Sequence, residues 1–364
     1  MRVAIIEPWF GESHATHFSG VAKHTVHDAS LTTLPARKWR WRMRTGAYHL
    51  SKPLTHLEGR QDVLLVSDYV NLPVLKCFAP HLAGVPTAVY FLENQLTYPK
   101  GTRHTADFEF MAINVLTCLA AEQSVFCSKR QQDDMMAAIP TFLKHDAEAD
   151  PDDIVRRIAA KSRIIPIGVD LERFDRARKS RTDRTGRPLR IVWPHRFEHD
   201  KNPDDFYEVV KTLDDEGLPF ELSVIGLSYR DLPQSLQEMR ERLSHRIVDW
   251  GFLKGDAYPN ALAASDLVLS TAWQETQGLA VIEAIRAGCD PLLPDRLSYP
   301  EVLGPVLSEK HLYRCKGDLR RRLRWMMRHP ERVRATSNHW RAMERFGWSV
   351  VGPQFDQLFE DLTG

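Results

Sequence analysis

Short apolar runs alternate with helix-periodic stretches along most of the chain. Strand-like runs occur in the first half at 3–6, 62–66, 85–91, 124–127 and 163–169, with a helical stretch at 107–122. The pattern then restarts, with strand-like runs at 189–193, 220–225, 246–250, 266–270 and 291–293 and helical stretches near 203–216, 233–244 and 256–264. This alternation predicts an α/β protein made of two Rossmann-like domains.

Polar composition locates the expected domain boundary. Residues 176–188 are arginine-rich and contain almost nothing that could enter a core, so we interpret them as an interdomain linker. We therefore expect an N-terminal domain at 1–178 and a C-terminal domain at 187–345. Residues 346–364 read as a final amphipathic helix, which we expect to pack back on the first domain.

An arginine-rich stretch at 319–345 has helical periodicity. Leu323, Trp325 and Met326 are spaced to pack inward. Most of the cations are interpreted as a solvated face, and their direct contact with tRNA or another anion is the less favoured interpretation.

Composition limits the class of protein. At 364 residues the chain is long enough for two full cores, and its formal net charge of +1 gives no global attraction to nucleic acid. The five cysteines are scattered, odd in number and free of metal-ligand spacing, and no apolar run approaches the roughly 18 residues of a membrane span. We expect a soluble protein of the reducing cytoplasm, without a membrane partner.

Two carboxylates follow the apolar run at 266–270, in the segment that we take as the centre of the second domain's site. The apolar run at 266–270 leads through a polar turn into a helical stretch that carries Glu275 and Glu283. If this helix begins near Thr276, its first free amides favour an anion such as a diphosphate at the edge of the sheet. These amides belong to Gln277, Gly278 and Leu279. The alternative is a Glu favoured by the helix dipole together with a solvated helical Glu.

Two cations follow the first strand of the second half. Arg196 and Lys201 could meet at the same diphosphate, Arg196 through a fork of donors and Lys201 as a point charge. Their effect would grow as a leaving nucleoside diphosphate accumulates negative charge. The alternative is local ion pairing with Glu198, Asp200 or Asp204.

Glycines follow the next two strands. Gly226 ends the run at 220–225, where a small residue lets a nucleotide approach the backbone, and Gly251 follows the next run. We infer that backbone groups around Gly251 and Phe252 recognise the base.

Polar residues also follow strands of the first half. The turn at 7–14, with one glycine, follows the first strand, and Glu93, Asn94 and Gln95 follow the run at 85–91. Open α/β sheets hold ligands just beyond the carboxyl ends of their strands. An ordinary strand-helix connection is the alternative for the turn at 7–14.

A basic segment interleaves five cations with two indoles inside eight residues. Its members are Arg37, Lys38, Trp39, Arg40, Trp41, Arg42 and Arg44. Such cations neutralise phosphates, and an indole offers a face on which an unstacked base can lie. A solvated amphipathic helix with buried tryptophans is the alternative.

These motifs together resemble a known family. Arg196 with Lys201 and Glu275 with Glu283 resemble retaining GT-B glycosyltransferases of the GT4 group. More closely, five segments look like the tRNA-queuosine α-mannosyltransferase family, and the similarity runs from the first strand to the final helix. These segments lie at 9–14, 34–42, 93–99, 191–201 and 275–283.

The resemblance implies a retaining transfer of mannose from GDP-mannose to the cyclopentenediol of queuosine, without a required metal or cofactor. The donor would lie across Arg196, Lys201, Glu275 and the amides of residues 276–279, with Glu283 on its ribose. Gly11, Ser13 and His14 would also contact the donor. The acceptor would be the queuosine-containing anticodon loop, with tRNA-Asp as the expected substrate, bound through the basic segment and Glu93 to Gln95.

Several positions depart from the family pattern. Glu12 replaces the second glycine of a Gly-Gly-Ser-His motif, Leu92 and Gln274 each replace a histidine, and an aromatic pair becomes Thr276 and Gln277. These positions surround the donor sugar and the acceptor, so the transferred sugar stays open.

Two other functions stay open. The first is a GT4-type transferase acting on a small molecule, lipid or glycan. A protein that does not bind tRNA would favour this function. The second is a catalytically inactive tRNA-binding protein with a glycosyltransferase fold. The presence of all four expected donor-binding residues, Arg196, Lys201, Glu275 and Glu283, argues against it.

Overall fold

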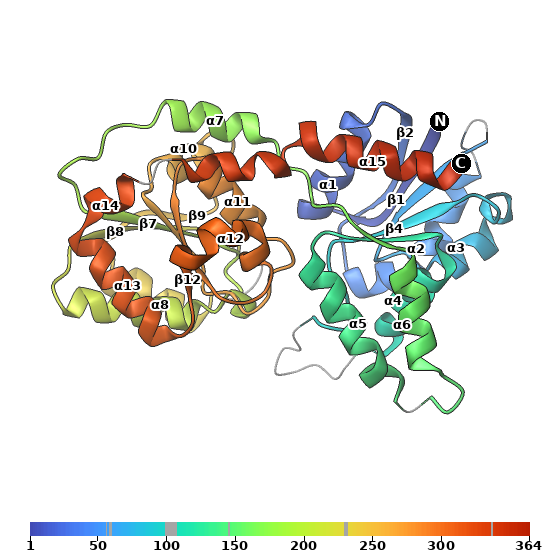
Figure 1. Cartoon of the computed structure of the whole chain (residues 1–364), viewed down its shortest axis with the longest axis horizontal. Coiled ribbons are helices and arrows are strands. Elements are labelled where there is room, and N and C mark those ends of the chain that lie inside the picture. Colours follow the sequence, from blue (N-terminus) through green and yellow to red (C-terminus); the bar gives the residue numbers. More distant parts are fainter. Residues whose placement is uncertain (56, 58–59, 99–107, 145, 229–231, 336–337) are drawn as a thin grey trace. The chain divides into compact units, whose positions relative to one another are not determined.

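The computed structural model describes all residues except 56, 58–59, 99–107, 145, 229–231 and 336–337. It contains two compact units (Figure 1): unit 1 comprises Met1–Gly168 and Trp348–Gly364, and unit 2 comprises Val169–Gly347. Pro99 of the 93–99 motif and Asp107 at the start of a predicted helix lie outside the described residues.

Unit 1 is built on a parallel sheet in the order β2-β1-β3-β4-β5-β6. Its strands are β1 (Arg2–Phe10), β2 (Asp28–Pro35), β3 (Val63–Ser67), β4 (Thr87–Phe91), β5 (Gln123–Phe126) and β6 (Ser162–Ile164). Its helices are α1 (Glu12–His24), α2 (Trp39–Leu54), α3 (Leu72–Phe78), η1 (Pro80–Leu82), α4 (Phe108–Ala120), α5 (Lys129–Leu143), α6 (Pro151–Ala160) and α15 (Trp348–Thr363). β3 and β4 are buried at every position, which explains their continuous apolar sequences.

Two features of unit 1 differ from the prediction. β1 continues through Glu7 to Phe10, so the predicted polar turn begins later than residue 7. β2 was not predicted, because this edge strand is only partly buried and carries few apolar residues.

The C-terminal helix α15 packs within unit 1. Its Asp356 accepts hydrogen bonds from Thr25 Oγ1 at 2.5 Å and from the Val26 amide at 3.2 Å. The Trp348 ring stacks on His24 with centroids 5.1 Å apart. The last helix is therefore held by side-chain contacts to the beginning of the chain.

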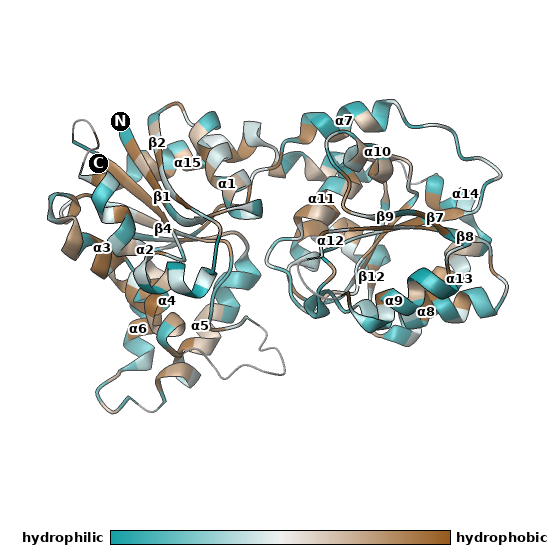
Figure 2. Cartoon of the chain, turned by 180° about the vertical axis from the view of Figure 1, so that it is seen from behind, coloured by the Kyte–Doolittle hydropathy of each residue, from teal (hydrophilic) through white to brown (hydrophobic). Residues whose placement is uncertain are grey.

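Unit 2 is built on a second parallel sheet, in the order β12-β11-β10-β7-β8-β9. Its strands are β7 (Leu189–Pro194), β8 (Phe220–Ile225), β9 (Ile247–Gly251), β10 (Leu267–Leu269), β11 (Asp290–Pro294) and β12 (Leu312–Tyr313). Its helices are α7 (Leu171–Lys179), η2 (His199–Lys201), α8 (Pro203–Asp215), α9 (Gln234–Arg242), α10 (Ala257–Ala263), α11 (Leu279–Arg286), α12 (Tyr299–His311), α13 (Lys316–Arg328), α14 (Pro330–Arg334) and η3 (His339–Phe346). Apolar residues gather on central strands such as β1 and β7, whereas α13 is largely hydrophilic (Figure 2). The predicted α/β class with two Rossmann-like sheets is confirmed.

The predicted linker at 176–188 is wrong. Helix α7 packs Phe174 and Ala177 into the core of unit 2, so the boundary follows Gly168 instead of residue 178. Arg184 is buried, and its Nε donates a hydrogen bond to Asp266 Oδ2 at 3.2 Å. Composition misled the prediction because ion pairing to a buried carboxylate allows arginines to enter the interior.

Trp325 on α13 also differs from the prediction. Leu323 and Met326 are buried as expected, but Trp325 is 52% exposed. Among the described residues, no helix combines the length and apolar character needed to cross a bilayer.

Candidate functional site

The topology of unit 2 brings two loops together. From β7 the chain proceeds to β8 and β9 on one side of the sheet, and from β10 to β11 and β12 on the other. Such a reversal leaves a ligand-binding crevice at the carboxyl ends of the two central strands, here β7 and β10. The loops at 195–202 and 270–278 begin at these two ends.

Direct hydrogen bonds hold the two loops. Thr271 Oγ1 lies 3.0 Å from the Lys201 carbonyl and 2.9 Å from the Asn202 carbonyl. Trp193 Nε1 donates to Thr271 Oγ1 at 3.2 Å, and the Trp273 amide donates to the Asp200 carbonyl at 2.8 Å. The backbone of this site is therefore fixed by contacts between segments that are distant in sequence.

Lys201 is the central cation of the unit 2 site. It is 7% exposed, and its Nζ donates to the Gln274 carbonyl at 2.7 Å. The same Nζ lies 3.4 Å from Glu275 Oε2 and 3.3 Å from Asp200 Oδ2. The structure thus brings Lys201 and Glu275 together. It also shows that Lys201 pairs with Asp200, one of the local carboxylates named as the alternative partners.

Arg196 is more accessible than Lys201. Its side chain is 41% exposed, and Nη2 lies 3.9 Å from Asp200 Oδ2. Arg196 and Lys201 thus approach one carboxylate, as two cations that share an anionic partner would.

The predicted start of the following helix near Thr276 is wrong. Helix α11 begins at Leu279, after Gly278 with φ 84°. The Val281 and Ile282 amides donate to the Gly278 carbonyl, so helical bonding starts there and residues 276–278 form a loop. A side chain at Gly278 would be strained, because that φ lies in the left-handed region.

Glu283 lies on α11 and is not the solvated helical residue of the alternative interpretation. Tyr258 OH donates to its Oε2 at 2.7 Å. Burial raises the pKa of Glu283 to about 7, against the opposing effects of the Tyr258 hydrogen bond and the Arg173 charge. The carboxylate therefore titrates near neutrality.

Gly226 follows β8 and Gly251 is the last residue of β9, and their surroundings differ. A Cβ on Gly226 would lie 1.8 Å from the His195 carbonyl oxygen, so packing of the β7 loop already requires glycine there. Gly251 has φ 86°, a Cβ placed on it would meet nothing within 4 Å, and Phe252 is 55% exposed. There is therefore free space beside the Gly251 Cα and an accessible ring at Phe252, while the Gly251 carbonyl accepts from the Gly226 amide at 3.1 Å.

A second polar cluster lies in unit 1, where the order β2-β1-β3 gives another reversal. His14 Nδ1 lies 2.8 Å from Glu7 Oε2, and both side chains are buried. Burial opposes protonation, but Glu7, with further help from Asp68 and Glu93, outweighs it and raises the pKa of His14 to about 9. His14 is thus a buried cation bound to Glu7.

Tyr69 and Asp68 follow β3 beside this pair. Tyr69 OH donates to Glu93 Oε1 at 2.5 Å, and Gln95 Nε2 donates to the same oxygen at 3.3 Å. Asp68 is fully buried, and burial raises its pKa well above the usual value. The sequence prediction missed Glu7, Asp68 and Tyr69. The rule applied to Glu93, polar residues just beyond a buried strand, would have found Asp68 and Tyr69.

Three other predicted site residues of unit 1, Gly11, Ser13 and Asn94, lie outside this polar cluster's hydrogen bonds. Gly11 packs so closely that a Cβ would lie 2.5 Å from Ala36 Cβ, and Ser13 is exposed. Asn94 is buried, and its Oδ1 accepts from the Thr97 amide at 3.0 Å, so it shapes its own loop.

The basic segment begins two residues before α2 and continues through its first turns, and its residues are of two kinds. Trp39 packs against Phe110 with ring centroids 5.3 Å apart, whereas Trp41 is 59% exposed. The alternative interpretation, in which both indoles are buried, is therefore wrong for Trp41.

The cations of the basic segment differ in their contacts. Arg44 Nε donates to Glu109 Oε2 at 2.8 Å, and Arg42 Nε donates to the Pro35 carbonyl at 3.2 Å. Arg37 and Lys38 are exposed, and Arg40 stacks on the Trp39 ring at 4.8 Å.

Comparison with known proteins matches both units. Residues 2–169 match the family model described as tRNA-queuosine alpha-mannosyltransferase N-terminal, and residues 175–340 match glycosyl transferases group 1. The tRNA-queuosine alpha-mannosyltransferase of Drosophila melanogaster is 30% identical over 367 residues, covering 98% of this chain and 96% of the relative. The chain belongs to the tRNA-queuosine alpha-mannosyltransferase family. It is therefore a glycosyltransferase, and the resemblance seen in its motifs is confirmed.

Solved structures confirm the GT-B fold of this glycosyltransferase. Sucrose-phosphate synthase from Thermosynechococcus elongatus has a TM-score of 0.72 at 12% identity, covering 100% of this chain and 99% of that chain. Anabaena HepE in complex with UDP has a TM-score of 0.71 at 14% identity, covering 99% of this chain and 100% of that chain. At these identities the likeness concerns the fold alone.

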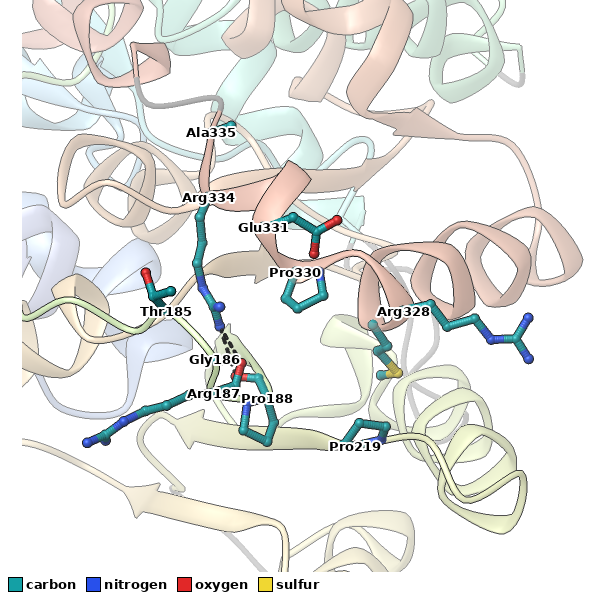
Figure 3. A pocket seen from close by; sticks show the side chains of 11 residues that line it. Thr185, Gly186, Arg187, Pro188, Pro219, Arg328, Pro330, Glu331, Arg334 and Ala335 are labelled. Atoms are coloured by element: carbon teal, nitrogen blue, oxygen red, sulfur yellow. Dashed lines mark hydrogen bonds between the residues drawn. The ribbon is translucent and has the colours of Figure 1, made fainter.

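Unit 2 of this glycosyltransferase also has a wide hollow, lined by the side chains in Figure 3. Its volume is about 820 Å³, and its lining includes Pro188 and Pro219, which precede β7 and β8. Arg334 donates to the Pro188 carbonyl at 3.1 Å, while Arg187 and Arg328 extend away from each other. The hollow is at the amino ends of the strands, so it is a separate feature from the Lys201 site.

Proposed function

We propose that this glycosyltransferase moves mannose from GDP-mannose to the cyclopentenediol of queuosine in the anticodon loop of tRNA, with tRNA-Asp as substrate and with retention at the anomeric carbon. Membership of the family supports the acceptor and the sugar. The observation that carries the proposal is the meeting of Lys201 and Glu275 where the unit 2 sheet reverses.

The cations of unit 2 are suited to the donor diphosphate. Arg196 and Lys201 both approach Asp200, so an incoming diphosphate would take the place of that carboxylate as their partner. Each charge-assisted hydrogen bond contributes about 1.5–3 kcal/mol. Because Lys201 is buried, its charge acts strongly on the oxygen that gains negative charge as the sugar departs.

The carboxylates of unit 2 have separate roles in this proposal. Glu275 holds Lys201 in position and accepts hydrogen bonds from sugar hydroxyls, and Glu283 accepts them from the donor ribose. The base lies against the Phe252 ring and in the free space beside the Gly251 Cα. Retention follows from attack on the face that the diphosphate leaves, with a phosphate oxygen accepting the proton of the acceptor hydroxyl.

The polar cluster of unit 1 is suited to a diol. Glu93 is only partly buried and accepts from Tyr69 and Gln95, so its carboxylate is oriented before a substrate arrives. A vicinal diol offers two O–H donors to such a carboxylate. Arg37, Lys38 and Trp41 provide exposed cations and an indole for the RNA around it.

Donor profiling on tRNA tests the proposal. The purified chain is incubated with queuosine-containing tRNA-Asp and, separately, GDP-mannose, GDP-fucose, UDP-glucose and UDP-galactose, and the nucleosides are analysed by mass. We expect one hexose on queuosine with GDP-mannose and none on the same tRNA lacking queuosine. A hexose gained only from another donor would overturn the choice of sugar, and no gain from any donor with folded protein would overturn the acceptor.

A further inference from the structure

Unit 2 contains a cluster of three metal-ligating side chains outside the donor site. Asp290 begins β11, His311 ends α12 and His339 begins η3. Asp290 and His311 are buried, and the His339 side chain is 18% exposed. Because Asp290 lies at the amino end of its strand, the cluster is at the opposite edge of the sheet from Lys201 and Glu275.

The distances between the three groups suit one shared metal ion. Asp290 Oδ1 lies 3.2 Å from His311 Nε2 and 2.8 Å from His339 Nδ1. One ligand atom from each residue lies within 4.8 Å of the others. Ligand atoms on a tetrahedral Zn²⁺, bound at about 2.0–2.1 Å, are about 3.3 Å apart. The two imidazole rings lie at 79° to each other, so they approach the carboxylate from different directions.

The hydrogen bond of His311 Nδ1, the ring nitrogen that does not face Asp290, determines which nitrogen carries the proton in the neutral ring. His311 Nδ1 lies 2.7 Å from the Leu307 carbonyl oxygen, which can only accept, so Nδ1 carries the hydrogen. In the neutral ring, Nε2 then directs a lone pair at the Asp290 carboxylate. A backbone carbonyl on the outer nitrogen is also the usual support of a metal-bound histidine.

His339 adds a second imidazole nitrogen to the cluster. Its Nδ1 is shielded from solvent and lies 2.8 Å from Asp290 Oδ1. Two imidazole nitrogens and a carboxylate oxygen therefore converge at one place, and a cation bound by all three would offset the cost of burying the carboxylate.

We propose that Asp290, His311 and His339 bind a Zn²⁺ ion that stabilises unit 2. Two nitrogens and one carboxylate oxygen are a ligand set that zinc accepts, with a fourth position for water. The ion would join the start of β11, the end of α12 and the start of η3, three segments held otherwise by packing and hydrogen bonds. Its role is structural, because none of the three residues lies at the strand ends that hold the proposed donor.

Metal titration of the full chain tests this site. After chelation, the protein is titrated with Zn²⁺ or Co²⁺ while bound metal, Co²⁺ absorption and Tm are measured. We expect one equivalent to bind, a tetrahedral Co²⁺ spectrum, and a Tm that rises with the Zn²⁺ concentration. His311→Gln and His339→Gln should each weaken metal binding about 10-fold or more.

A matched control separates this site from adventitious binding. His245 Nε2 lies 3.2 Å from Asp214 Oδ1 on an exposed part of unit 2, so His245→Gln should leave the affinity unchanged. If His311→Gln does not fold, His339→Gln is the variant to use, because His339 is the most exposed of the three residues and its replacement disturbs the core least. Absence of binding by the folded wild-type chain would overturn the proposal, as would an affinity unchanged in folded His339→Gln. In the first case the cluster is an imidazolium-carboxylate ion pair.

Discussion

Lys201 Nζ lies 3.4 Å from Glu275 Oε2, although the two residues follow different strands of the unit 2 sheet. The hydrogen bonds of Thr271 to the Lys201 and Asn202 carbonyls hold the intervening backbones together. A buried cation with a preset carboxylate neighbour needs little reorganisation when negative charge develops on a diphosphate.

Removing either member of this pair should slow sugar transfer. We expect Lys201→Ala and Glu275→Gln each to lower turnover about 10²-fold or more, because both act where charge develops. Single-turnover transfer measures the reduction, and filter binding should show tRNA affinity close to wild type. Lys179→Ala, which removes an exposed lysine of α7, is the control. Near-normal turnover in Lys201→Ala would contradict the assignment.

The exposed indole of α2 should contribute to tRNA binding. A base stacked on an aromatic ring contributes about 1–3 kcal/mol, so Trp41→Ala should weaken tRNA binding about 5- to 150-fold. Trp325→Ala removes an indole of similar exposure from unit 2 and is the matched control. Equal effects of the two substitutions would contradict a specific role for Trp41.

The exposed cations Arg37 and Lys38 of the basic segment should contribute to the salt dependence of tRNA affinity. Removing one cation from a phosphate lowers the slope of log K against log salt by about 0.7–0.9. Arg37→Ala with Lys38→Ala should therefore reduce the magnitude of this slope by about 1.4–1.8, measured by fluorescence titration at several salt concentrations. The same slope in variant and wild type would exclude these two cations from the RNA interface.

Donor use should depend on the ionisation of Glu283. Ribose hydroxyls bind the carboxylate form, and its pKa is raised to about 7 mainly by burial, so kcat/KM for the donor should rise with pH through about 7. The hydrogen bond from Tyr258 favours the ionised form, so Tyr258→Phe should move this rise to higher pH. Tyr207→Phe on α8 is the control. An unshifted profile in Tyr258→Phe would contradict the role of Glu283.

The His14–Glu7 pair should make stability pH-dependent. His14 has a pKa raised to about 9, against 6.5 in the unfolded chain, so its contribution to stability is full below pH 6.5 and is lost as pH rises through about 9. The Tm should fall over this range less steeply in Glu7→Gln than in wild type. His49→Gln, on the exposed face of α2, should keep the wild-type slope. Parallel slopes in Glu7→Gln and wild type would contradict the pairing.

Much of the fold was predictable because its signals are local. The runs that became β3 and β4 are buried at every position, and β7 and β8 are buried at all but their second position, so apolar residues predominate in all four. The edge strand β2 is half exposed and has no such run. The start of α11 was misplaced because Gly278 adopts φ 84° beside Tyr299, a backbone conformation that apolar periodicity does not record.

The sequence by itself determined the α/β class, the family, and the residue types of the proposed donor site, since strand periodicity and short motifs are properties of neighbouring residues. Tertiary structure alone decided which distant groups meet. It placed Arg184 against Asp266 and Asp290 between two histidines. Each of these contacts requires sheet order and loop closure to bring charges within a few ångströms, and no local pattern records that step.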